Sequence, residues 1–271
     1  MTLIVSPEWL NEHLEDEDLV IVDCRFSLAD SEEGARQYQA SHIPGASYLH
    51  LNRDLSAPVA KHGGRHPLPD PAELSEKLAS IGINSGKTLV VAYDDTRFAF
   101  AGRLWWLLQY MGHSRAAVLD GGWGGWLSAG YGTTNELPQK IGGNFLPEIQ
   151  VGMVVDIETV KARKDLPGVA LVDSRDRDRY LGEREPIDPI AGHIPGAVNY
   201  PWKDATDEGG KARPAEAQSQ RWTQLDSAEE IIVYCGSGVT ACTNLLSLEI
   251  AGKKNSKLYA GSWSDWCSYL V

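Results

Sequence analysis

The sequence contains little cysteine and no long apolar run. Its 271 residues include four cysteines, which is too few for a disulfide scaffold in a chain of this length. No Cys-x-x-Cys pair or cysteine–histidine cluster has the spacing of a zinc site, so we expect no metal. No stretch approaches the roughly 18 consecutive apolar residues that span a bilayer, and the first residues lack the basic segment of a signal peptide. These absences predict a cytoplasmic protein that does not act in a membrane.

Positive charge is also scarce. The chain has 25 Lys and Arg against 37 Asp and Glu, which gives a formal net charge of −12. Proteins that bind nucleic acid need clustered Lys and Arg to contact phosphates, so we expect no nucleic-acid partner. An anionic substrate would have to be attracted by a local group of cations against the overall field.

The most informative feature present is an internal repeat. Four sequence blocks return in the same order, at an offset of roughly 140–150 residues. "LVIVDCR" (19–25) recurs as "ALVDSR" (170–175), and "LVVAYDD" (89–95) recurs as "IIVYCGS" (231–237). "HIPGA" stands at 42–46 and 193–197, and "LDGGWGGW" (119–126) recurs as "YAGSWSDW" (259–266). The repeat predicts two homologous domains, residues 1–133 and 150–271, joined by a linker at 134–149.

Each repeat alternates short apolar runs with helical patterns, which favours an α/β domain with a mainly parallel sheet flanked by helices. Asp70 and Pro71 have the spacing of an N-cap and first residue of a helix. We expect strands at 19–23, 88–93, 116–119, 170–173, 231–234 and 257–259, and helices at 71–81, 101–111 and 240–251.

Cys235 lies where an expected strand ends and a helix begins. In a parallel α/β sheet, ligands bind in the crevice beyond the carboxyl ends of the strands. Two glycines allow the following loop to turn sharply, and the helix adds its positive N-terminal end. The backbone N–H groups of the loop would then stabilise a thiolate and a sulfur atom bonded to it. The residues predicted to form this cradle are Gly236, Gly238, Val239 and Thr240.

The first repeat has no thiol at the corresponding position. Aligning "VVAYDD" with "IIVYCGS" places Asp94 opposite Cys235. We therefore expect one active site per chain and a catalytically inactive first domain.

Two reaction classes use a cysteine in an anion-binding loop. A cysteine-dependent phosphatase places an arginine six residues after the cysteine to bind phosphate oxygens bidentately. That position is Ala241 here, which argues against a phosphatase. The other class accepts a sulfane sulfur onto the thiolate and passes the sulfur to a second nucleophile. A small loop of Gly and Ser suits this persulfide chemistry.

The chain resembles the tandem-domain rhodanese sulfurtransferases over essentially its full length. The resemblance rests on the two "HIPGA" blocks, on "CGSGVTA" at 235–241 and on the closing "YAGSWSDW". It implies two domains of one fold, a single catalytic Cys235 and no cofactor. The implied reaction moves sulfur from 3-mercaptopyruvate or a related donor to Cys235, then to an acceptor such as cyanide or a thiol. A thioredoxin-like reductant is a further partner on this view.

The resemblance leaves the donor open between two branches. Thiosulfate-preferring members resemble a loop with Arg and Lys directly after the cysteine, whereas 3-mercaptopyruvate-preferring members resemble "CGSGVTA". The second branch also uses two arginines before the second "HIPG" block to hold the donor's carboxylate. Arg179 matches the first arginine, but the second falls near Ile187, and Arg184 is the nearest replacement in sequence. Thiosulfate therefore stays an alternative donor, and a non-catalytic sulfur carrier or interaction module stays a third interpretation.

The 3-mercaptopyruvate branch is also associated with a relay of Ser, His and Asp that moves the donor's thiol proton. The resemblance assigns Ser237 to the Ser, His66 to the His and Asp54 to the Asp. His62 is a rival to His66.

Three further residues have a structural interpretation. His42 and His193 occur in both repeats, including the repeat without the thiol, so we expect them to be structural. Cys242 is expected to be a buried helix residue. A Cys235–Cys242 disulfide under oxidation is the alternative.

Overall fold

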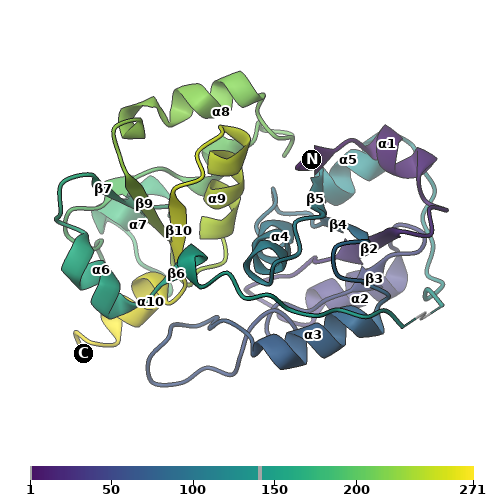
Figure 1. Ribbon diagram of the computed structural model, residues 1–271, viewed down its shortest axis with the longest axis horizontal. Helices are drawn as coiled ribbons and strands as arrows, with labels where there is room; N and C mark the ends of the chain where they lie inside the picture. Colours follow the sequence, from purple (N-terminus) through teal and green to yellow (C-terminus); the bar gives the residue numbers. More distant parts are fainter. Residues whose placement is uncertain (1, 140–141) are drawn as a thin grey trace. The chain divides into compact units, whose positions relative to one another are not determined.

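The chain folds into two compact α/β units. The computed structural model describes residues 2–139 and 142–271. The first unit comprises residues 1–57, 69–150 and 208–212, and the second comprises 58–68, 151–207 and 213–271. Each unit contains a five-stranded, fully parallel sheet flanked by helices (Figure 1). The predicted fold class is confirmed.

The first unit has the strand order β1-β5-β4-β2-β3. Its strands are β1 Ile4–Val5, β2 Leu19–Asp23, β3 Ser47–Tyr48, β4 Leu89–Tyr93 and β5 Ala116–Leu119. Its helices are α1 Pro7–Glu12, α2 Glu33–Ala40, α3 Pro71–Ser80, α4 Ala101–Tyr110 and α5 Gly122–Ser128.

The second unit repeats this order as β6-β10-β9-β7-β8. Its strands are β6 Val154–Val155, β7 Val169–Asp173, β8 Val198–Asn199, β9 Glu230–Tyr234 and β10 Ser256–Tyr259. Its α-helices are α6 Ile157–Arg163, α7 Arg177–Leu181, α8 Ala215–Arg221, α9 Ala241–Ile250 and α10 Ser262–Cys267. Three short 3-10 helices cover Val151–Met153, Trp202–Ala205 and Thr223–Leu225. The two sheets are therefore copies of one topology.

The expected strands and helices form within one residue of their predicted ends. At the start of α3, Asp70 Oδ1 accepts hydrogen bonds from the backbone N–H groups of Ala72 (2.8 Å) and Glu73 (3.1 Å), as an N-cap does. The sequence did not reveal the edge strands β1, β3, β6 and β8. Each has two residues, which is too short to show a periodic pattern.

The central strands are buried on both faces because helices cover both sides of each sheet. Residues 90–93 of β4 and 231–234 of β9 are at most 1% exposed. Fully burying one such Val or Ile side chain contributes about 1.5–3 kcal/mol to folding. Burial holds the carboxyl end of each central strand in place. No helix within residues 2–139 and 142–271 is long and apolar enough to cross a membrane.

The units differ from the predicted domain ranges because residues 58–68 belong to the second unit. This stretch, called the 58–68 segment below, has no regular secondary structure, so its polar groups need partners elsewhere. Gly63 N–H donates to Asp265 Oδ1 (2.7 Å), and Arg65 N–H donates to Ser264 Oγ (3.2 Å). The segment is thereby anchored along α10.

Of the stretch predicted as a linker, 134–149, the described residues 134–139 and 142–149 belong to the first unit. Phe145 is buried at 4% exposure. Gly143 N–H donates to Ala79 O (2.7 Å), and Glu148 N–H donates to Met111 O (2.8 Å). These bonds make residues 142–149 part of the compact unit.

The two repeated histidines occupy equivalent structural positions. His42 Nδ1 lies 2.6 Å from Tyr38 O, and its ring stacks on Tyr38. His193 Nδ1 lies 2.8 Å from Tyr180 O, and its ring stacks on Tyr180. Both rings connect a helix to the "HIPGA" turn that follows it, which agrees with the structural interpretation.

Candidate active site

Cys235 directly follows β9 and is 1% exposed. Its N–H donates to Ser262 Oγ (3.1 Å), and its carbonyl accepts from Trp263 N–H (3.0 Å). Ser262 has φ 57°, a left-handed conformation that brings its hydroxyl back to Cys235. The start of α10 thus fixes the backbone on which the thiol is carried.

The cysteine loop, residues 235–240, turns back so that one backbone N–H faces the sulfur atom. Gly238 N–H lies 3.2 Å from Cys235 Sγ. Gly238 has φ 78°, and a Cβ atom there would come within 2.2 Å of Ala260 O, so only glycine fits. The ten-residue helix α9 begins at Ala241, directly after the loop, and its N-terminal end carries partial positive charge. The loop can therefore hold an anion or an added sulfur atom at the thiol.

Ser237 and His66 form a buried hydrogen-bonded pair in this loop. His66 Nδ1 lies 2.7 Å from Ser237 Oγ, and both residues are 7% exposed. The rival His62 lies elsewhere. Its Nδ1 is 2.7 Å from Ser268 Oγ, and its ring stacks on Tyr269 with the centroids 4.1 Å apart. The structure thus brings His66, rather than His62, to the cysteine loop.

Two guanidinium groups lie against Gly236. A Cβ atom at Gly236 would be 3.1 Å from Arg65 Nη2 and 3.5 Å from Arg179 Nη1. Arg179 comes from α7, as expected, whereas Arg65 comes from the 58–68 segment. Burial and the neighbouring Arg179 charge both lower the pKa of Arg65. The pair forms the local cation group that a negatively charged chain needs in order to bind an anion.

Buried carboxylates hold the two arginines in position. Asp188 Oδ1 accepts from Arg65 Nη1, and Asp188 Oδ2 accepts from Arg179 Nη2 (3.1 Å). Glu185 accepts from Arg179 Nη2 (2.7 Å) and Nε (3.2 Å). Glu185 also forms an ion pair with Arg175, and Arg175 forms a second ion pair with Asp173. The cluster has as many carboxylates as guanidinium groups: Asp173, Glu185 and Asp188 against Arg65, Arg175 and Arg179.

Arg184 does not take the place of the missing second arginine. Its Nε donates to Asp178 Oδ2 (2.6 Å), and its side chain is 55% exposed. Ile187 is also exposed, at 47%. The ion pair with Asp178 holds the Arg184 guanidinium at the surface, which corrects the expectation that Arg184 replaces the missing arginine.

Asp54 belongs to the first unit. Its Oδ2 accepts from His50 N–H (2.7 Å), and its Oδ1 pairs with Lys77 Nζ (2.9 Å). The role of Asp54 in a proton relay stays a prediction.

Sequence reasoning missed Arg65 and its partner Asp188. A signal for Arg65 was present, because it directly precedes His66 in "GGRHPLP". A segment that brings His66 to the loop brings its neighbour there too.

Cys242 is buried in the first turn of α9, as expected. Its Sγ donates to Gly238 O (3.4 Å). All four cysteines are free in the structure. No group of three or more His, Cys, Asp or Glu side chains within residues 2–139 and 142–271 could hold a metal ion.

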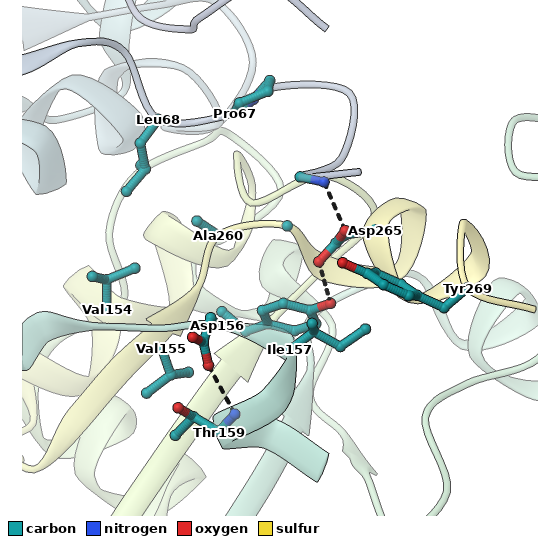
Figure 2. Close-up of a pocket in the computed structure, with 13 residues that line it drawn as sticks. Pro67, Leu68, Val154, Val155, Asp156, Ile157, Thr159, Ala260, Asp265 and Tyr269 are labelled. Atoms are coloured by element: carbon teal, nitrogen blue, oxygen red, sulfur yellow. Dashed lines mark hydrogen bonds between the residues drawn. The ribbon is translucent and has the colours of Figure 1, made fainter. Parts of the chain in front are cut away.

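A hollow of about 510 Å³ lies beside the 58–68 segment (Figure 2). Its lining includes Leu68, Val154 and Tyr269, together with Asp265. Asp265 accepts from Tyr259 Oη (2.7 Å) as well as from Gly63 N–H, so one carboxylate connects β10 to the 58–68 segment. Asp265 thereby helps to position the segment that carries Arg65 and His66.

Two parts of the chain match one protein family. The rhodanese-like domain family matches residues 6–129 and again residues 156–269. This chain belongs to the rhodanese family. The two matches fall on the two copies of the sheet, so it is a tandem-domain member.

Relatives with curated names cover nearly the whole chain. The chain is 46% identical to the "Probable 3-mercaptopyruvate sulfurtransferase" of Pseudomonas aeruginosa, over 97% of this chain and 94% of that protein. It is 31% identical to the thiosulfate sulfurtransferase of Mus musculus, over 97% of this chain and 91% of that protein.

Among solved structures, SseA from Escherichia coli is one of the 3-mercaptopyruvate sulfotransferases. It superposes on this rhodanese with a TM-score of 0.85 at 29% identity, covering 97% of this chain and 100% of that one.

Proposed function

We propose that this rhodanese is a sulfurtransferase that moves sulfur from 3-mercaptopyruvate through a Cys235 persulfide to a thiophilic acceptor. The observation that carries the proposal is the position of the Cys235 thiol. Its sulfur accepts from Gly238 N–H at 3.2 Å, in a loop flanked by the Ser237–His66 pair and two guanidinium groups. Relatives named as sulfurtransferases cover at least 97% of the chain.

In the first half-reaction, the Cys235 thiolate attacks the thiol sulfur of 3-mercaptopyruvate. An S–S bond forms, and the C–S bond breaks with its electron pair going to carbon. The resulting enolate takes up the proton that left the thiol, so thiolate and mercaptopyruvate give a persulfide anion and pyruvate. The N–H of Gly238 already contacts the sulfur, and the amides of Gly236, Val239 and Thr240 are proposed to join it in stabilising the charge on the persulfide.

In the second half-reaction, an acceptor removes the outer sulfur. Cyanide attacks this sulfur, a C–S bond forms, and the S–S bond breaks to return the Cys235 thiolate and thiocyanate. A thiol acceptor, or a thioredoxin-like reductant, would attack the same sulfur. Because the enzyme holds the sulfur covalently between two substrates, ping-pong kinetics are expected.

The Ser237–His66 pair is suited to carrying the proton from the donor's thiol to the enolate during the first half-reaction. The 2.7 Å contact between Oγ and Nδ1 lets the hydroxyl and the imidazole exchange a proton. Both groups are nearly excluded from water, which keeps the proton within the site. Asp54 is proposed as a supporting carboxylate on the resemblance alone.

The charge balance of the site favours a donor with one negative charge. Two guanidinium groups face the loop, but the buried carboxylates behind them bring the cluster close to neutrality. A singly charged mercaptopyruvate adds one negative charge beside the thiolate, whereas thiosulfate adds two. Thiosulfate remains the second candidate donor, favoured by the mouse relative and by the presence of two cations.

The first rhodanese domain is proposed to be catalytically inactive, because Asp94 stands where the second domain has Cys235. A cytoplasmic location is proposed from the composition and from the four free cysteines, which suit a reducing compartment.

The proposal is tested by comparing kcat/KM for 3-mercaptopyruvate and thiosulfate on one preparation, with cyanide as the acceptor. We expect a value about tenfold or more higher for 3-mercaptopyruvate. Arg179→Ala should lower kcat/KM by about 10- to 100-fold with either donor, since it removes charged hydrogen bonds to the donor's anionic end. Arg184→Ala is the matched control and should change neither.

Two outcomes would contradict the proposal. Thiocyanate formation from neither donor would favour the non-catalytic sulfur carrier or interaction module. A clear preference for thiosulfate would keep the reaction class and replace the donor.

A further inference from the structure

Asn244 is a buried amide in α9, the helix that follows the cysteine loop, and it is 0% exposed. Its Nδ2 donates to Ser174 Oγ (2.9 Å) and to Tyr200 O (2.7 Å). Its Oδ1 accepts from Arg221 Nη2 (2.8 Å). Three hydrogen bonds from one side chain therefore hold the first half of α9 in place.

Ser174 connects this amide to the other end of the cysteine loop. It directly follows β7, and its N–H donates to the carbonyl of Tyr234 (2.8 Å), the last residue of β9 before Cys235. Ser174 thus contacts the strand before the loop through its backbone and the helix after the loop through its hydroxyl. The two ends between which residues 235–240 turn are thereby held to one residue.

The first unit has the same backbone contact with apolar side chains in place of the polar pair. Cys24 stands at the position of Ser174 in the repeat, and its N–H donates to Tyr93 O (2.8 Å). Leu104 is the fourth residue of α4, as Asn244 is the fourth residue of α9. Cys24 and Leu104 are buried, at 1% and 0% exposure. The Asn244–Ser174 hydrogen bond therefore distinguishes the unit that carries the thiol at the loop from the unit that does not.

Folding alone does not require this buried polar pair. Replacing both partners of a buried hydrogen bond by apolar groups of similar shape can be nearly neutral for stability, and the first unit has such groups. A buried amide that loses a partner costs about 1–3 kcal/mol, so its bonds confine the helix to one position. Satisfied buried networks make a core more rigid and more specific. The pair is therefore suited to fixing the geometry of the cysteine loop.

We propose that Asn244 and Ser174 are positioning residues for sulfur transfer. They hold the N-terminal end of α9 and the Gly238 N–H against Cys235 Sγ, and they thereby stabilise the thiolate that attacks the donor. The inference rests on the proposed function for its role in catalysis, whereas its test by alkylation needs no sulfur donor.

The pH dependence of Cys235 alkylation by iodoacetamide tests this role, with the modified peptide identified by mass spectrometry. The rate rises as the thiolate forms, so the midpoint of the profile reports how well the loop stabilises the charge. In Asn244→Leu and in Ser174→Ala the midpoint should move up by about half a pH unit or more. Below the midpoint, kcat/KM with 3-mercaptopyruvate should fall about threefold, and it should recover at high pH.

Ser247→Ala is the matched control, because Ser247 lies one turn further along α9. Its Oγ accepts from Trp222 Nε1 (2.8 Å), in the part of the buried network away from Ser174. This variant should lose stability in urea denaturation and keep the midpoint. The double variant Asn244→Leu/Ser174→Ala should shift the profile no further than either single variant, since both changes remove the same hydrogen bond.

An unchanged midpoint in Ser174→Ala would overturn the inference, even if Asn244→Leu fails to fold. A shift of equal size in Ser247→Ala would also overturn it, since that result would indicate a general loosening of α9. Faster alkylation at every pH without a change of midpoint would contradict it as well, because it would show greater exposure of the sulfur alone. The expected shifts in a protein that transfers sulfur from neither donor would contradict the proposed function and leave the positioning of the thiolate supported.

Discussion

The loops after β4 and β9 are the same turn in two copies, and they treat negative charge in different ways. In the first unit, the Asp94 carboxylate accepts from the backbone N–H groups of Thr96 (2.8 Å), Phe98 (3.1 Å), Phe100 (2.8 Å) and Ala101 (2.8 Å). In the second unit, Cys235 Sγ accepts from the N–H of Gly238.

The surrounding backbone is alike in the two loops. Trp123 N–H donates to Asp94 O (2.8 Å), as Trp263 N–H donates to Cys235 O. Gly122 and Ser262 both have positive φ, at 54° and 57°. The comparison shows that this turn directs backbone N–H groups at an acceptor in both copies. The acceptor is the Asp94 carboxylate in the first copy and the Cys235 sulfur in the second, to which the proposed function adds a second sulfur atom.

The largest expected difference between the loops comes from the thiol itself. Cys235→Ser should reduce sulfur transfer by about 1,000-fold or more, because a serine hydroxyl cannot form the persulfide. Cys24→Ala, which removes a buried thiol from the first unit, should stay within about twofold per folded molecule. Thiocyanate formation measures both. Mass spectrometry should show the mass of one added sulfur atom in Cys24→Ala and not in Cys235→Ser. Persistent transfer by Cys235→Ser would remove this cysteine from the mechanism.

The second contrast is the Ser237–His66 pair, which a proton-transfer role predicts to act as a unit. Ser237→Ala and His66→Ala should each lower kcat about 10- to 100-fold, and the double variant should be little worse than either. His62→Ala is the control, because its ring faces Ser268 and Tyr269. If the loss of kcat in the double variant equals the product of the two single losses, the two groups act independently. Solvent isotope effects on kcat should shrink in each single variant.

The smallest expected effect on activity belongs to Asp94. Asp94→Ala leaves four N–H groups, three of them buried, without their acceptor and should lower the free energy of unfolding by about 2–4 kcal/mol. Asp95→Ala, at an exposed neighbouring position, should change it by about 0.5 kcal/mol or less. Urea denaturation measures both, and kcat per folded molecule should stay the same. If the two variants are equally stable, the first loop is not a filled cradle.

Burial acts against the Asp94 charge that these amides stabilise. Desolvation raises the pKa of this carboxyl, while the N–H groups of Ala101, Thr96 and Phe100 lower it. All four groups that contact the Asp94 side chain are N–H donors. They therefore favour the ionised carboxylate over the protonated acid.

The sequence was sufficient for those features that depend on local patterns. Buried parallel strands leave short apolar runs, and a strand followed by Cys, two glycines and a helix marks the crevice. The repeat then placed Asp94 opposite Cys235 without any structure. His66 and Arg179 were found through the resemblance, which supplied their motifs.

The features that the sequence did not reveal depend on long-range contacts. The position of Arg65 is set by Ser264 and Asp188, which lie 199 and 123 residues away in the chain. The sequence does not tell which of Arg184 and Arg65 lies beside the cysteine loop. The carboxylates with which they pair decide this: Asp178 holds Arg184, whereas Asp188 holds Arg65. No local pattern encodes that choice.

The 58–68 segment has a consequence for how this gene could be shortened. A chain reduced to residues 150–271 would keep the nucleophile and its loop but would lose His66 and Arg65. On the proposed function, it would keep the thiol that accepts sulfur but would lack the residue that carries the proton. The first repeat therefore contributes a residue to the site of the second, even though its own loop has no thiol.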